Sequence, residues 1–514
     1  MNQDDYQALR QDYINQIVTV AKKHIPYFKF LEDISLQNPI ATGTITKTSE
    51  NPKKTKVIPL ETVLKNEMYY SDVVDILDSY ENILETTFNA AGKEVTDDVK
   101  IHIGGDQLTR ERFSGAKGLR AAENNVKNRF GHLTPVTFEM FHLLMNFLQG
   151  FFDFLYSDKS AGDLGTLKCE INRVMRSQVD QDVKKAYDAD KDFVIAFLNA
   201  YIVELLCERF GMEDHLSVPT KNIPPEFSSV EEKKIWMNEV IGKLVDEMVW
   251  PKKIEDIQDD VIEDGQYLPV TLKLSNGTEI SICPRIRTTN KKSVDEGSDK
   301  VKNYGHLVLE LGMLFKELLG VCKSPERNQM LRLLKHSMTV FKARSNNSKY
   351  ALEIHRFLIQ QISTLSEKEA AEVVTGMFVN TKGKVDSYIP ADLQMEYMVK
   401  TIKKHIKHMY SNKSEANIAK QTRSLSGIQD LSEHFDKASG VVHRCKKHKK
   451  KDSDGDELLM IQDLRKLRPF SFQSGRLHND FPNIKKSVIE YMNVDHYHSW
   501  IRSRIVINAN DLGQ

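Results

Sequence analysis

The stretch Asp192–Leu206, DFVIAFLNAYIVELL, is apolar around nearly its whole circumference when it is drawn as a helix. A helix that is hydrophobic on almost every face must be buried among other elements. No apolar run in the chain approaches the roughly 18 residues that a membrane span needs. We therefore predict a buried central helix here, surrounded by further helices that fill most of 160–255 and 300–412.

The spacing of apolar residues changes between these two helical regions, from the helical period to every second residue. Residues 267–283 alternate apolar and polar side chains around Asn276-Gly277. Asn-Gly between two alternating runs is the strongest short signal for a β-hairpin. We expect one hairpin here, packed on the helices or extending a sheet.

A second predicted strand lies directly before an acidic residue, Asp106. In Lys100–Phe113, KIHIGGDQLTRERF, Ile101 and Ile103 alternate as in a half-buried strand, and two glycines permit a sharp turn before Asp106. Acids at the carboxyl ends of strands are candidates for metal or substrate chemistry. The alternative is that Asp106 simply caps the helix that follows.

His142 lies in an apolar stretch that follows, Phe138–Phe147, which we predict to be a helix. A strand-end acid followed by such a histidine suggests a nuclease-like site. The alternative for His142 is a histidine whose hydrogen bonds are satisfied inside the core.

Composition restricts the class of protein. Lysine plus arginine balances aspartate plus glutamate, so the net charge is zero and the whole chain gives no argument for nucleic-acid binding. The run Lys400–His408 is basic and could contact phosphates, although a solvated helix face is the simpler explanation. Five widely separated cysteines and a polar, acidic start favour an intracellular protein, nuclear or cytoplasmic, with no membrane association.

Several stretches resemble a family known only as domain of unknown function 6589 (DUF6589), whose members look derived from mobile elements. The matching stretches are 58–77, 105–112, the helix with His142, 167–176, 186–193, 349–353, 380–383, 392–396 and 463–470.

The layout also resembles transposases with a ribonuclease-H-like core. In such enzymes three acids hold two divalent metal ions, because hard cations take oxygen ligands and paired metals stabilise both the attacking and the leaving oxygen. The resemblance implies that Asp106 is the second acid and that Glu353 or Glu396 is the third. The alternative for each glutamate is a solvated helix position. If the site is active, Mg²⁺ or Mn²⁺ is its cofactor; otherwise no cofactor is expected.

The first acid has no counterpart here. Longer relatives carry it on a strand in an additional N-terminal portion, and this chain begins after that portion. Asp72, Asp75 and Asp78 follow a helical pattern instead. We therefore expect Asp106, Glu353, Glu396 and His142 to form a catalytically inactive remnant, with Asp106 and Glu396 as its metal-facing acids.

The expected fold is α+β and predominantly helical, with a partial ribonuclease-H-like core, a large helical insertion and one hairpin. The expected segments are an N-terminal helix with a mobile arm (1–57), a core segment (58–158), the insertion (159–345), helices returning to the core (346–440), a disordered charged linker (441–457) and a C-terminal tail (458–514). Two functions are open: a transposase remnant that binds DNA, or a non-enzymatic helical scaffold that binds partner proteins.

Overall fold

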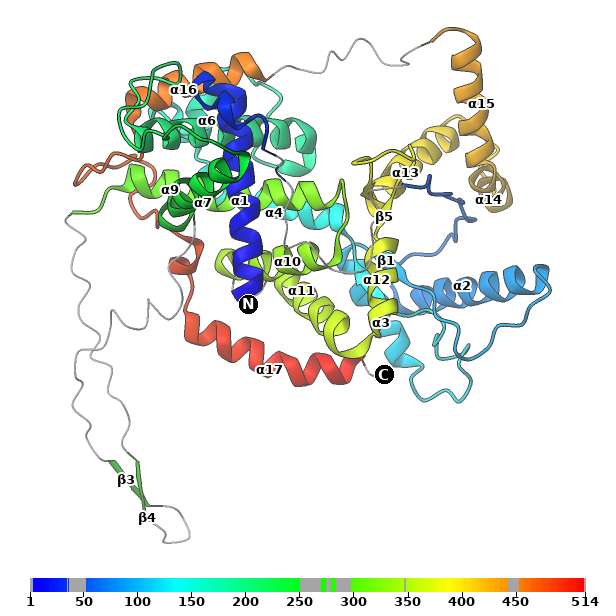
Figure 1. Cartoon of the computed structure of the whole chain (residues 1–514). Coiled ribbons are helices and arrows are strands. Elements are labelled where there is room, and N and C mark those ends of the chain that lie inside the picture. Colours follow the sequence, from blue (N-terminus) through cyan, green and yellow to red (C-terminus); the bar gives the residue numbers. More distant parts are fainter. Residues whose placement is uncertain are drawn as a thin grey trace.

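The computed structural model is predominantly helical (Figure 1). It describes residues 3–34, 36, 52–249, 270–273, 279–282, 297–345, 348–441 and 453–512. Most of the arm expected before residue 57 and most of the expected linker after 441 lie outside these residues. No described helix combines the length and the apolar character needed to cross a bilayer.

Long helices form most of the described chain. The N-terminal half contains α1 (Gln3–His24), α2 (Tyr70–Ala90), α3 (Gln107–Leu119), α4 (Met140–Leu155), α5 (Leu167–Arg173), α6 (Val183–Phe210) and α7 (Val230–Met248). The C-terminal half contains α9 (Lys300–Val321), α10 (Arg327–Arg344), α11 (Lys349–Ile359), α12 (Glu367–Gly376), α13 (Ala391–Lys407), α14 (Glu415–Arg423), α15 (Leu425–Ala438), α16 (Asp454–Leu467) and α17 (Val494–Leu512). Shorter helical turns are η1 (Pro26–Leu31), η2 (Asp158–Gly162), η3 (Gln360–Thr364) and η4 (Val488–Tyr491).

In the described residues, the predicted helical regions are mainly helical, and their longest non-helical breaks lie at 174–182, 211–229 and 377–390. Residues 211–229, between α6 and α7, are not helical. In the second region, β5 (Phe378–Val379) and β6 (Ile389–Pro390) form a short antiparallel pair before α13. The chain around these last two breaks contains the prolines and glycines that end helices.

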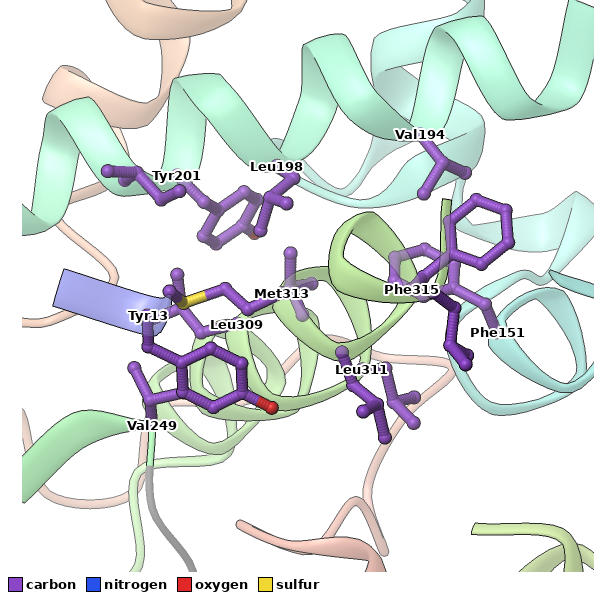
Figure 2. Close-up of a cluster of buried hydrophobic side chains, with 14 of the residues drawn as sticks. Tyr13, Phe151, Val194, Leu198, Tyr201, Val249, Leu309, Leu311, Met313 and Phe315 are labelled. Carbon is purple, nitrogen blue, oxygen red and sulfur yellow. The ribbon is translucent and has the colours of Figure 1, made fainter. Parts of the chain in front are cut away.

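Helix α6 is the central buried element, as its sequence predicts. Most of its side chains from Phe193 to Cys207 are buried, and Gly211 ends it in a left-handed conformation with φ 61°. Figure 2 shows Leu309 and Met313 of α9 lying between α6 and Tyr13 of α1. A Cβ on Gly312 would lie 2.8 Å from Leu198 Cδ1, so glycine allows α9 to approach α6 closely.

Helix α16 joins the same core through Met460, Ile461 and Leu464. It begins at Asp454, so the expectation of a disordered linker up to residue 457 is wrong for its last four residues. The reason is a contact between the buried Glu457 and α1. Glu457 lies 2.6 Å from His24 Nε2 of α1, and this contact fixes the first turn of α16.

Strands form three separate two-stranded sheets in the described chain. β3 (Val270–Lys273) and β4 (Glu279–Ile282) pair antiparallel, as predicted for the hairpin, while its turn at Asn276-Gly277 lies outside the described residues. They do not extend another described sheet. β1 (Ile103–Gly105) and β2 (Val136–Phe138) pair in parallel, and this pair positions the candidate site.

Candidate functional site

Two acids follow the two parallel strands. Gly105 of β1 pairs with Phe138 of β2, and Asp106 and Glu139 come directly after these paired residues. Phe138 was predicted as helical but lies in β2, where the β-branched Val136 and Thr137 favour the extended backbone. Both carboxylates therefore stand at the same edge of the strand pair.

Asp106 caps helix α3. Its Oδ1 accepts a hydrogen bond of 2.7 Å from the backbone N–H of Thr109. This is the structural alternative that the sequence left open, and it engages one oxygen of the carboxylate with an otherwise unpaired helix donor.

Glu139 is buried behind β1. A Cβ on Gly104 would lie 1.5 Å from Glu139 Oε1, so only glycine leaves room for this side chain. Glu139 Oε2 has no hydrogen-bond partner among the described protein atoms. Burial, and then the charge of Asp392, raise the pKa of Glu139 well above its ordinary value. The buried position therefore favours the protonated form of Glu139.

Asp392, at the start of α13, clamps the first turn of α4. Its Oδ1 accepts the N–H of Phe141 at 3.0 Å, and its Oδ2 accepts the N–H of His142, also at 3.0 Å. The same Oδ2 lies 2.9 Å from His142 Nδ1. A carboxylate here satisfies unpaired amides and complements the positive end of the helix dipole.

His142 lies among acids rather than among purely apolar side chains. The hydrogen bond with Asp392 raises the pKa of His142, and the charges of Asp106 and Glu396 act in the same direction against burial. Its Nε2 is 3.9 Å from Glu396 Oε1, on the exposed side of α13. Asp106, His142 and Glu396 are thus brought together.

Glu353 is held elsewhere, by two arginines. Its Oε1 accepts from Arg110 at 2.6 Å and from Arg356 at 3.1 Å, and its Oε2 lies 2.5 Å from Arg110 Nε. The Glu353 side chain is only 2% exposed. Burial is the main influence on its pKa, which is raised, while both guanidinium groups oppose that rise. The position is neither solvated nor open to a cation.

These residues do not fit a paired-metal centre. A hard cation needs several free oxygen ligands. Asp106 and Asp392 already cap helices, Glu139 is buried, and both oxygens of Glu353 contact guanidinium groups. Within the described ranges, no group of three or more His, Cys, Asp or Glu residues could hold a metal ion.

Sequence reasoning missed Glu139 and Asp392. The signal for Glu139 was the extended run Pro135–Phe138 immediately before it, which resembles the run before Asp106. Asp392 stands in the first turn of a predicted helix four residues before Glu396. Its role could not be read from the sequence because its partners are 250 residues away.

Searches of curated proteins and of solved structures find no match to the chain. The family model described as a family of unknown function, DUF6589, matches residues 1–448. The matched range contains the strand pair, α4 and α13, and it ends before α16. The chain belongs to the DUF6589 family of unknown function.

Proposed function

We propose that the chain is a transposon-derived protein with a reduced ribonuclease-H-like core, and that it binds DNA without cutting it. Two acids at the carboxyl ends of adjacent parallel strands support the relationship to such nucleases. We expect DNA to bind at a locally basic surface, because the chain as a whole has no net charge.

The contacts of Asp392 are the main support for the proposal that the protein does not cut DNA. Both oxygens of this carboxylate accept hydrogen bonds from the first turn of α4, and one of them also contacts His142. Asp106 makes a comparable contact at α3. Acids that could have been ligands instead accept backbone amides at the first turns of α3 and α4, so this part of the molecule acts as a structural joint.

The expected location is the nucleus or the cytoplasm. Cys169, Cys207 and Cys322 are free, which suits a reducing compartment. DNA is then the partner in the nucleus, and no metal cofactor is needed for binding.

Binding and nicking measured together test the proposal. A supercoiled plasmid is incubated with the protein and Mg²⁺ or Mn²⁺, and DNA binding is followed by gel shift in the same samples. We expect retarded but unnicked plasmid, with Asp106→Ala behaving like the parent. Metal-dependent nicking that Asp106→Ala abolishes would contradict the proposal.

A second candidate function is a scaffold for partner proteins. Leu431 and Phe435 lie one turn apart on α15 and are 70% and 64% exposed. Exposed large apolar side chains at helical spacing are typical of helix–protein contacts. A stoichiometric protein partner that is lost with Leu431→Ser and Phe435→Ser, in a protein without DNA affinity, would favour this candidate.

A further inference from the structure

We infer that the carboxyl-terminal half of α13 and the turn after it bind single-stranded nucleic acid. The inference rests on the proposed function and assigns the surface and the form of the ligand. In Figure 1, α13 lies with α14 and α15 towards one edge of the molecule. Its amino end carries Asp392 and Glu396, so the structural joint and this surface share one helix.

Four lysines form a stripe along α13. Lys400, Lys403, Lys404 and Lys407 are spaced i, i+3, i+4 and i+7, which places them on one face of the helix. All four are exposed, and none forms an ion pair with a described residue. By contrast, the exposed Lys65, Lys100 and Lys349 each lie within 3.0 Å of a carboxylate oxygen, at Asp75, Glu369 and Glu111.

The surrounding sequence concentrates the charge. Residues 397–414 contain five lysines and two histidines but no aspartate or glutamate, although the whole chain is neutral. In sequence, the nearest acids are Glu396 before the stripe and Glu415 after it, and the charge of Asp188 of α6 acts on Tyr397. A local positive surface on a neutral protein is the pattern expected for a phosphate-binding site.

Two tyrosines bracket the lysines. Tyr397 is 51% exposed and Tyr410 is 81% exposed. Tyr410 also has a φ of 47°, a left-handed conformation that bulky residues seldom adopt. A large aromatic side chain is thus held outward in a turn where glycine or asparagine is the usual choice. Sparsely populated conformations of this kind cluster at binding sites.

The combination favours a single strand over other polyanions. The stripe from Lys400 to Lys407 spans about 10 Å along the helix axis, enough for roughly three successive phosphates of one strand. Unpaired bases expose faces that stack on tyrosine, whereas a duplex hides them and an acidic peptide has none. A membrane surface would require well-exposed apolar side chains among the lysines, whereas Ile402, Ile406 and Met409 are each partly buried.

Fluorescence anisotropy with labelled oligonucleotides tests the inference on the full chain. The ligands are oligo-dT, a single-stranded RNA, a duplex DNA and polyglutamate of matched charge. One variant reverses the stripe with Lys400→Glu, Lys403→Glu, Lys404→Glu and Lys407→Glu. Its matched control makes the same change at four exposed lysines elsewhere, Lys29, Lys221, Lys243 and Lys368. Tyr410→Ala and Tyr410→Phe test stacking, and circular dichroism checks that every variant is folded.

We expect the parent to bind both single strands more tightly than duplex or polyglutamate. Reversal of the stripe should weaken oligo-dT binding at least about ten-fold and reduce the salt slope by roughly 3, from about 0.7 per lost contact. Tyr410→Ala should weaken binding about five-fold or more. Tyr410→Phe keeps the aromatic ring and should bind like the parent, and so should the control with four lysines reversed elsewhere.

Each contrary result has a distinct meaning. If a folded stripe variant binds as tightly as the parent, this surface is wrong while DNA binding stands. If duplex or polyglutamate binds best, the single-strand assignment is wrong. If the parent binds no nucleic acid at low salt, the proposed function fails and the inference fails with it.

Discussion

Asp392 Oδ2 lies 2.9 Å from His142 Nδ1, across 250 residues of sequence. The same carboxylate accepts the N–H groups of Phe141 and His142 in the first turn of α4, so α13 is fixed to α4 by one side chain. Asp392 and His142 resemble catalytic groups, but here their contact connects two helices, α13 and α4.

The histidine of this joint should make stability depend on pH. The hydrogen bond with Asp392 raises the pKa of His142, so its stabilisation is complete below about 6.5, the pKa of an unfolded histidine. It is lost as pH rises through the folded pKa. In urea unfolding, His142→Asn should therefore cost about 1 kcal/mol more at pH 5.5 than at pH 8.5. The exposed His434→Asn is the control, and an equal cost of His142→Asn at both pH values would refute the coupling.

The buried pair of Glu353 and Arg110 should show strong non-additivity. Glu353→Ala leaves Arg110 buried without its carboxylate, which should cost roughly 3–5 kcal/mol. Replacing both residues, with Glu353→Leu and Arg110→Met, should cost less than that single change because no charge is then stranded. Urea unfolding of the single and double variants measures this. A double variant less stable than Glu353→Ala would mean that the pair is not coupled in this way.

Phe197 lies in the centre of α6 and is fully buried. Phe197→Ala should lower the free energy of unfolding by roughly 3–5 kcal/mol through the cavity it leaves. Phe435→Ala makes the same chemical change on an exposed face of α15 and should cost less than about 0.5 kcal/mol. Comparable losses at the two positions in urea titration would contradict the buried position of α6.

Gly104 should tolerate no side chain while Glu139 is present. A Cβ there would lie 1.5 Å from Glu139 Oε1, so Gly104→Ala should destabilise the protein by roughly 1–3 kcal/mol or more through overpacking. Adding Glu139→Ala should recover part of that loss, as thermal unfolding would show. If the second change adds its own cost in full, the two positions do not compete for the same space.

The helical body could be predicted because its signals are local. The all-round apolar pattern of 192–206 and the period-two run of 267–283 are properties of short segments, and both elements are found. The helix start at Asp454 was not predicted, because it depends on a buried contact between Glu457 and His24 of α1. A charged run looks solvated until its distant partner is known.

The candidate site was only partly predictable for the same reason. Asp106 could be recognised because its strand, its glycines and its helix are adjacent in sequence. Glu353 resembled a ligand equally well, but its two arginine partners decide its role. Asp392 was overlooked in favour of Glu396, because only the folded chain places Asp392 against α4. Contacts between distant segments, rather than residue type, separate the structural acids from exposed ones.

Direct titration with Mn²⁺ tests the central claim, that Asp106 and Asp392 form a structural joint and not a metal centre. Electron paramagnetic resonance of free Mn²⁺ is measured as the parent protein and Asp106→Asn are added at equal concentrations. The account predicts no saturable Mn²⁺ binding that distinguishes the two proteins. Stoichiometric Mn²⁺ binding by the parent that disappears in Asp106→Asn would contradict it.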